Sequence, residues 1–172
     1  RLAGNPEYSQ GKVKSYTDAV EAHFRPFADH AVVKHAQRLR TSRGISYDAV
    51  AGYALHLDGL EALAKTAFDP LPPRLDRRWT SQDASAFAQD LAAFVVDAKV
   101  TQFFAAQKEL YDGAEAAMRE CLAKHCNLAW FDSFFGARPG ARFSLCLGLL
   151  NGGGNYGPSV QKQAGEELYC VL

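Results

Sequence analysis

The sequence has no long hydrophobic run and no excess charge of either sign. Its longest apolar stretches, 91–96 and 145–150, are far shorter than the roughly 20 residues that cross a bilayer, so no membrane span is expected. Lysine plus arginine equals aspartate plus glutamate at 19 each, which leaves no net field to attract phosphate backbones. Nucleic acid is therefore not an expected partner.

A disulfide framework is not indicated either. The four cysteines crowd into the last third of the chain, in apolar surroundings: Cys121, Cys126, Cys146 and Cys170. Free cysteine is a common core residue, so we expect reduced, buried side chains, whereas native pairing would indicate a secreted protein. Residues 1–10 have neither a basic start nor an apolar stretch, so they show no signal peptide. The compartment of this soluble protein stays open between the cytoplasm and the exterior.

What the sequence does contain is an ordinary globular composition with helical spacing over most of its length. It is 48% hydrophobic and 22% charged, which is typical of a folded domain. Hydroxyl residues three positions before an acid, at Ser15 and Thr80, indicate helix starts. Gly44 and Ser46 are typical of a helix stop and the next start. We expect a mainly α fold of about five to seven helices, with a small antiparallel β hairpin near the C-terminus.

Prolines and glycines divide the chain into four parts. These parts are N-terminal helices over 1–68, a Pro-rich connection over 69–79, a helical hairpin and a short aromatic helix over 80–136, and a strand, Gly-rich loop and second strand over 137–172. The two strands, 142–150 and 167–172, are expected to form an antiparallel pair.

Cys121, His125 and Cys126 have the spacing of metal ligands, C-x-x-x-H-C. Residues four apart share a helix face, so Cys121 and His125 can hold one ion. No second ligand pair lies at a recognised spacing, and Cys121 continues the apolar stripe of its helix, which favours core packing. The other histidines lie apart without an H-E-x-x-H pattern, and surface or helix-terminal positions are expected for them: His23, His30, His35 and His56.

Two aromatic clusters each allow a functional and a structural interpretation. Asp76-Arg77-Arg78-Trp79 joins a forked cation to a ring and can grip an anion, although such clusters more often anchor a loop. A second group resembles a ligand cage, yet rings three and four apart on a helix usually form core: Trp130, Phe131, Phe134 and Phe135. We expect the structural role for both clusters.

The glycine-rich stretch 151–158, Asn-Gly-Gly-Gly-Asn-Tyr-Gly-Pro, is the most informative segment. Ordering its glycines costs backbone entropy, and they supply no side-chain packing in return, so another role must favour glycine at these positions. One explanation is a hairpin connection with positive backbone angles. The other is that exposed backbone donors are approached closely by a ligand. The residues do not decide between the two.

Three segments together resemble the bacterial domain-of-unknown-function 4932 family. They are the helix 129–136, Ala-Trp-Phe-Asp-Ser-Phe-Phe-Gly, the strand segment 142–150, and the loop 151–158. The segments 75–79 and 5–9 are similar as well, so the resemblance covers nearly the whole chain. It implies a relative of zinc metallopeptidases, in which a helix with H-E-x-x-H binds zinc and its glutamate activates water.

No H-E-x-x-H occurs within the 172 residues, so no catalytic residue is assigned here. The resemblance implies that the chain is the N-terminal scaffold and cleft wall of a zinc-dependent metallopeptidase, with zinc bound by the parent protein and not by this chain. The loop residues that would flank the peptide substrate are Asn151, Gly153, Asn155, Tyr156 and Gly157. The hairpin is expected to contact the protein's own C-terminal region or to self-associate. The alternative is a non-catalytic helical protein-binding domain.

Overall fold

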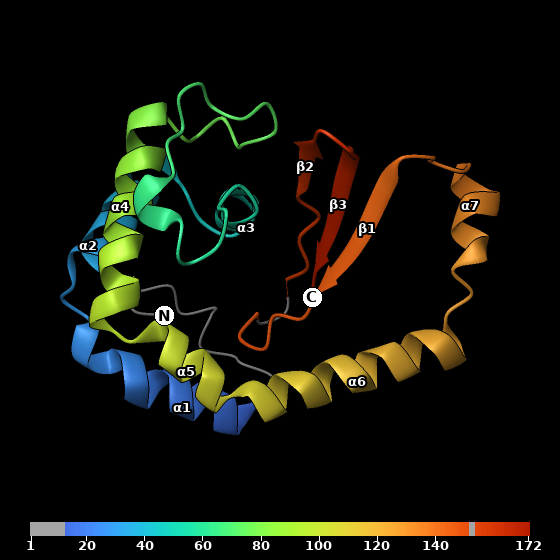
Figure 1. Ribbon diagram of the computed structural model, residues 1–172, viewed down its shortest axis with the longest axis horizontal. Coiled ribbons are helices and arrows are strands. Elements are labelled where there is room, and N and C mark those ends of the chain that lie inside the picture. Colours follow the sequence, from blue (N-terminus) through green and yellow to red (C-terminus); the bar gives the residue numbers. More distant parts are fainter. Residues whose placement is uncertain (1–12, 152–153) are drawn as a thin grey trace.

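The computed structural model describes residues 13–151 and 154–172, and helices dominate these parts of the chain (Figure 1). The α-helices are α1 Lys14–Phe24, α2 Ala31–Arg43, α3 Asp48–Ala54, α4 Ser81–Asp97, α5 Val100–Ala106, α6 Lys108–His125 and α7 Ala129–Phe135. The strands are β1 Ala141–Cys146, β2 Ser159–Lys162 and β3 Gly165–Val171. The expected mainly α fold with a small β part at the C-terminal end is confirmed. None of the described helices is long and apolar enough to cross a membrane.

Local sequence signals correctly placed one helix start and one helix end. The Thr80 hydroxyl accepts a hydrogen bond from the Asp83 amide at 3.1 Å and so caps α4. Gly44 ends α2 with φ of 66°, a left-handed conformation in which glycine lacks the Cβ penalty. Both ends depend on contacts within a few residues, which is why the sequence alone identified them.

Two expected caps are wrong. Helix α1 begins at Lys14 with no side-chain cap, so Ser15 lies inside it. Helix α3 begins after Tyr47 rather than after a cap at Ser46, and Tyr47 has φ of 49° and ψ of −111°. Such a backbone is costly for a bulky residue and persists only where surrounding contacts impose it. Here the Tyr47 ring lies 6.4 Å from the ring of Tyr156, which comes from the glycine-rich loop.

The main core lies among α2, α3, α4 and the Pro-rich connection. The Tyr53 ring stacks on Trp79 with centroids 4.3 Å apart and on Phe68 at 5.2 Å. Trp79 Nε1 donates to the Ala49 carbonyl at 3.1 Å, and the Tyr53 hydroxyl donates to the Ala84 carbonyl at 2.8 Å. Both buried rings therefore have their polar atom satisfied. Because Phe68 and Trp79 flank the prolines, the helices on either side of the connection share one core.

Arg78 anchors the Pro-rich connection, which is the structural role that its cluster predicted. Its guanidinium donates to the Asp76 and Asp48 carboxylates within 2.9 Å and to the Gly44 carbonyl at 2.8 Å. These bonds join the connection to the end of α2 and the start of α3. The side-chain hydrogen bond from Arg78 also holds the pKa of Asp76 below its ordinary value.

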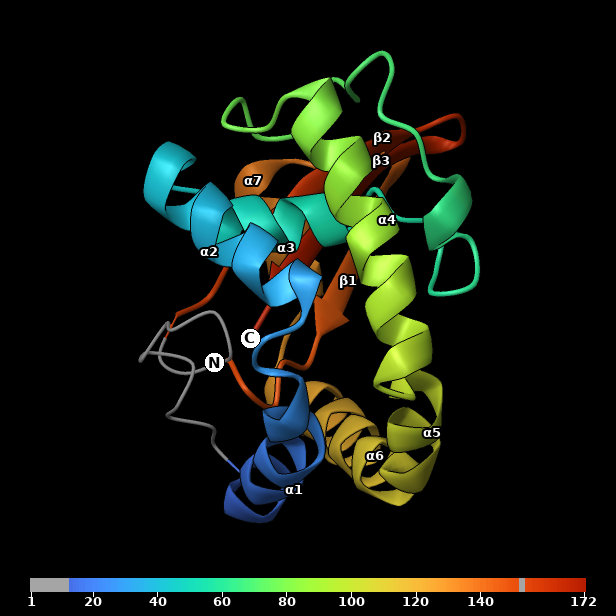
Figure 2. The same cartoon turned by 90° about the vertical axis from the view of Figure 1, so that its left-hand side faces the viewer.

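The expected helical hairpin is wrong, because α6 does not pack back along α4. After Lys99, which has a positive φ of 50°, the short helix α5 turns the chain, and α6 then runs away at a steep angle (Figures 1 and 2). Phe103 of α5 is buried. The Tyr111 and Tyr16 hydroxyls share a hydrogen bond of 2.9 Å near the start of α6. No residue of α6 is buried, so its apolar stripe lies outside the helical core.

The sheet has the strand order β1-β3-β2, with β3 in the centre. Strands β2 and β3 form an antiparallel hairpin joined by residues 163–164, whereas β1 runs parallel to β3 with Phe143 opposite Leu168. A Cβ on Gly165, where φ is 136°, would collide with the Gly140 carbonyl oxygen. Glycine is therefore required where the hairpin returns beside the start of β1.

The expected antiparallel pairing of 142–150 with 167–172 is wrong. The two segments are neighbours but run in the same direction, and β1 already ends at Cys146. Residues 147–158 belong to the crossover between them, so the glycine-rich loop is not the turn of a hairpin. A parallel pair needs such a long crossover, and this one places β2 on the far edge before β3 enters the sheet.

The Glu166 carboxylate of β3 links the sheet to segments outside it. Glu166 Oε1 forms an ion pair with Arg74 of the Pro-rich connection at 2.6 Å, and Oε2 accepts from Arg138, which precedes β1, at 2.7 Å. Arg74 also donates to the Ser159 hydroxyl of β2 at 3.0 Å. Glu166 is largely buried, so these charge-assisted bonds link three distant segments in a partly desolvated place.

Candidate functional site

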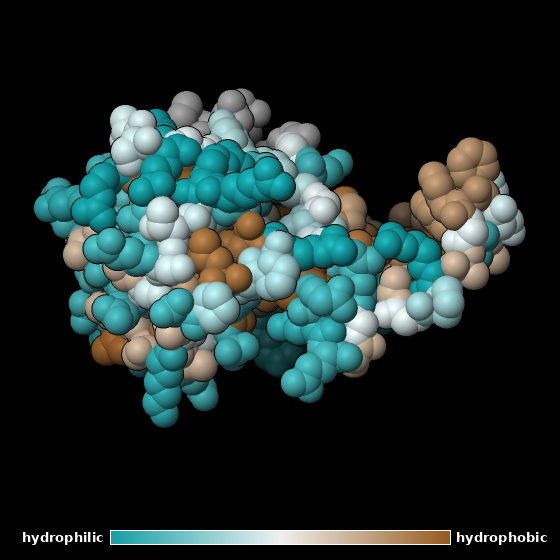
Figure 3. Space-filling model, turned by 90° about the horizontal axis from the view of Figure 1, so that it is seen from above, coloured by the Kyte–Doolittle hydropathy of each residue, from teal (hydrophilic) through white to brown (hydrophobic). Residues whose placement is uncertain are grey.

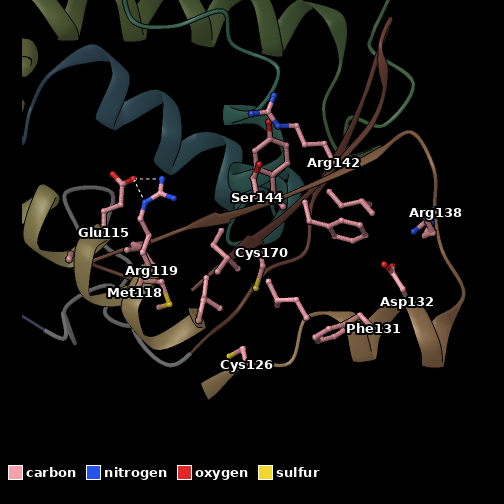
Figure 4. Close-up of a pocket in the computed structure, with 18 of the residues that line it drawn as sticks. Glu115, Met118, Arg119, Cys126, Phe131, Asp132, Arg138, Arg142, Ser144 and Cys170 are labelled. Carbon is pink, nitrogen blue, oxygen red and sulfur yellow. Dashed lines mark hydrogen bonds and ion pairs between the residues drawn. The ribbon is translucent and has the colours of Figure 1, made fainter. Parts of the chain in front are cut away.

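A large groove opens between α6, α7 and one face of the sheet (Figure 4). Its volume is about 1580 Å³, which exceeds the roughly 300–1,000 Å³ of pockets for small ligands. Most of the lining is apolar. The side chains that define it are Met118 and Leu122 of α6, Phe131 and Phe135 of α7, Phe143 and Leu145 of β1, and Leu168 and Cys170 of β3.

The floor of the groove is one face of the sheet. The parallel register places Phe143 opposite Leu168 and Leu145 opposite Cys170, so these four side chains point to the same side. Phe143 is 69% exposed and Leu145 43% exposed. By the same alternation Val160 of β2 points to the other side, where it is buried. The sheet thus has apolar side chains on both faces, but only one face is covered.

Helix α6 forms the long side wall. Residues at spacings of three and four on this helix line the groove: Tyr111, Ala114, Met118 and Leu122. Sequence periodicity predicted an apolar stripe through Tyr111, Ala114, Met118 and Cys121, so it identified three of these residues but included Cys121, which does not line the groove, in place of Leu122. The assignment of this stripe to a core failed because the turn at Lys99 points the helix away from α4, so the stripe faces open space.

Helix α7 forms the end wall, and its aromatic residues are not core, contrary to expectation. The rings are exposed to these extents: Trp130 48%, Phe131 54%, Phe134 67% and Phe135 68%. Trp130 stacks on Phe134 at 4.8 Å, and Phe131 lies parallel to Phe135 at 6.2 Å. The second pair lines the groove and the first pair faces elsewhere. An apolar lobe consequently protrudes at the right edge of the space-filling view (Figure 3).

A seven-residue helix with rings on every side cannot bury them all against one neighbour. A helix that is apolar all round is usually surrounded by protein, which is why the sequence predicted core. In this chain α7 stands at the far end of α6 (Figure 1), where no second layer of the described chain reaches it. The aromatic residues therefore form a surface rather than an interior.

The candidate metal ligands do not form a centre. Cys121 and Cys126 are both exposed free thiols at the end of α6, so the expectation of core packing for Cys121 is wrong as well. Among the residues that the structure describes, no group of three or more histidine, cysteine, aspartate or glutamate side chains is placed to hold a metal ion.

The histidines occupy structural positions, one of which was not expected. His35 is buried rather than at the surface, and its Nδ1 donates to Asp90 Oδ2 at 2.6 Å, which joins α2 to α4. Its Nε2 has no hydrogen-bond partner within the described part of the chain. His30 is at a helix end, as expected, and its Nδ1 accepts from the Val32 amide at 3.2 Å.

Four of the five loop residues that were predicted to flank a cleft are described, and these four do not line the groove. Asn151 is buried, and its Nδ2 donates to the Gly154 carbonyl at 2.7 Å, so it holds the loop in shape. Tyr156 pairs with Val171 through two backbone bonds of 3.0 and 2.8 Å. Asn155 and Gly157 are exposed, and Gly153 lies outside the described residues. The role of this loop as a cleft wall stays a prediction.

One thiol and one phenol of the sheet have raised pKa values. Burial, and then the neighbouring Cys170, raise the pKa of the Cys146 thiol. The hydrogen bond to Glu167, followed by burial, raises the pKa of Tyr169. A protonated thiol is a poor nucleophile.

Comparison with known proteins adds no assignment. A scan against models of known protein families, a search of curated proteins and a search of solved structures each found no match. Functional inference therefore depends on the groove and on the sequence patterns.

Proposed function

We propose that this chain is a scaffold that binds a second polypeptide in the groove between α6, α7 and the sheet. The observation that carries the proposal is the bare apolar face of β1 and β3, where Phe143 and Leu145 are exposed. A sheet with apolar residues on both faces is normally covered on both. A folded polypeptide can cover such a face with a continuous apolar surface.

The exposed apolar area supports a polypeptide partner. Aromatic side chains bury about 150–250 Å² each, so the three exposed rings that line the groove, Phe131, Phe135 and Phe143, present on the order of 400 Å². With Trp130 and Phe134, which face elsewhere, the exposed ring surface is on the order of 600 Å². The rings of the groove alone match a large apolar patch on an ordinary monomer, which covers about 300–600 Å², and reach about half of the roughly 800 Å² that each partner buries in a stable protein interface.

A peptide selection tests this function. Peptides selected from a displayed random library on the native chain are expected to be rich in apolar residues and to lose binding to Leu145→Asp and Met118→Glu, which place charge in the groove. They should keep binding to Val96→Asp, because Val96 is an exposed apolar residue of α4 that does not line the groove. Peptides that bind all three variants alike would show that the groove is not the binding site.

A second candidate function is the cleft wall of a zinc-dependent peptidase, as the family resemblance implies. It is supported by the position of β1 at an open edge of the sheet beside the groove, because extended substrates add to such edges through backbone hydrogen bonds. Zinc and the H-E-x-x-H helix would then come from polypeptide other than residues 1–172. The isolated chain is expected to hydrolyse no peptide.

The gene sequence that encodes residues following Leu172 distinguishes the two functions. An H-E-x-x-H motif there, together with zinc-dependent peptide hydrolysis by the longer protein, would support the peptidase. A longer protein without the motif, or one that remains inactive with zinc, would leave the binding function alone.

A further inference from the structure

The groove and the apolar lobe of α7 lie within one arm of the same chain, formed by α6, α7 and β1 (Figure 1). The groove is a concave surface, and the pair Trp130 and Phe134 forms a convex one that does not line it. We propose that a second copy of this chain occupies the groove by inserting its α7, and that the exchange is reciprocal. The proposal rests on the proposed function, since it names the polypeptide that the groove binds.

The size of α7 fits the groove. A helix rises 1.5 Å per residue and is about 10–12 Å wide, so a seven-residue helix occupies on the order of 1,000 Å³. The groove has a volume of about 1580 Å³, which accommodates α7 together with its protruding rings.

The area and charge of the chain favour self-association. In a reciprocal exchange each copy contributes both its lobe and its groove, so the roughly 600 Å² of exposed ring surface on each copy is buried. The formal net charge is zero, with 19 basic and 19 acidic residues, so two copies do not repel each other at long range. Trp130 and Phe134 are residue types that often dominate interface energies or bury large apolar area.

The position of lobe and groove on one arm also favours a closed pair over an open chain of molecules. When α7 of each copy enters the groove of the other, the same surface is used twice and no binding site remains free. The inner rings Phe131 and Phe135 then line the site that receives the neighbour, while Trp130 and Phe134 fill the neighbour's site. All four rings of α7 become buried in this arrangement.

Sedimentation velocity over a concentration series tests the exchange on the full chain. Wild type is expected to form a dimer. A lobe variant, Trp130→Ser with Phe134→Ser, and a groove variant, Leu145→Glu, are each expected to weaken the dimer by at least tenfold. All three positions are exposed, so the variants should fold, which circular dichroism checks. The matched control Val96→Ser, an exposed apolar residue on α4, should associate as wild type does.

An equimolar mixture of the two variants distinguishes insertion from simple stacking of lobes. The lobe variant keeps an intact groove and the groove variant keeps an intact lobe, so one of the two contacts survives in the mixed pair. Native mass spectrometry should therefore show a heterodimer at a concentration where neither variant pairs with itself, although it should dissociate more readily than the wild-type dimer.

Three results would overturn the proposal. They are a wild type that stays monomeric at every concentration, a groove variant that dimerises as well as wild type, and a control that weakens the dimer as much as the lobe variant does. A monomeric chain whose groove still binds selected peptides would refute the exchange and leave the proposed function standing. Dimerisation by insertion without peptide binding would support the exchange and restrict the partner to this chain.

Discussion

A substitution of Glu166 tests what holds the sheet, and therefore the groove, in position. Glu166 joins Arg74, Arg138 and β3 through two ion pairs of 2.6 and 2.7 Å. The substitution Glu166→Gln keeps the shape of the side chain and removes its charge. We expect both ion pairs to weaken and the sheet to be held less firmly against the helical body.

The size of the effect follows from burial. A hydrogen bond to a charged group contributes about 1.5–3 kcal/mol when it is well buried, and an exposed ion pair contributes about 0–1 kcal/mol. Glu166 is 15% exposed, but Arg74 and Arg138 are 44% and 54% exposed, so each bond belongs near the lower end. Because glutamine keeps part of the bonding, the expected loss is about 1–2 kcal/mol of unfolding free energy.

Amide hydrogen exchange and urea unfolding measure this loss. A change of about 1.4 kcal/mol corresponds to a tenfold change in an opening equilibrium, so protection of the β3 amides should fall about tenfold. The α2 and α4 amides should change less, because the aromatic core does not involve Glu166. The matched control Glu120→Gln breaks an exposed pair with Lys124 and should cost less than about 0.5 kcal/mol. If Glu166→Gln lowers the free energy of unfolding no more than the control does, or lowers amide protection equally throughout the molecule, the Glu166 ion pairs do not position the sheet.

Three further perturbations have defined outcomes. The Arg78 hydrogen bond lowers the folded-state pKa of Asp76 below the unfolded value near 3.8. The ionised Asp76 carboxylate therefore stabilises the folded protein above pH 3.8, and this stabilisation is lost as the pH falls through the lower, folded-state pKa. Asp76→Asn should therefore cost about 1 kcal/mol at neutral pH in urea unfolding, and the difference from wild type should vanish in acid; a constant difference would contradict this. Gly165→Ala should cost about 1–3 kcal/mol because of its positive φ and the Gly140 carbonyl, and an unchanged unfolding midpoint would show that the turn adapts. Calorimetric titration of metal-free protein with zinc should show at most weak binding, and a tight site that Cys121→Ala abolishes would refute that.

Some features of this protein were predictable because they depend on neighbouring residues. Thr80 caps α4 and Gly44 ends α2 through contacts that span three to six residues, and the mainly α fold follows from apolar spacing over whole helices. The sequence also identified most of the apolar stripe of α6, and it predicted a strand over 142–150, of which residues 142–146 are a strand. In each case the chemistry that sets the structure lies within one element.

Other features depended on where the elements meet in space. The apolar stripe of α6 and the rings of α7 have the same sequence signature whether a neighbour covers them or not, and the turn at Lys99 leaves them beside an open groove. Alternation along β1 shows that it is a strand but is the same for parallel and antiparallel partners, so the direction of β3 was not predictable. The burial of His35 against Asp90, 55 residues away, could not be predicted from local sequence patterns either. Periodicity records which face of an element is apolar, whereas the partner of that face is selected by contacts between residues distant in the chain.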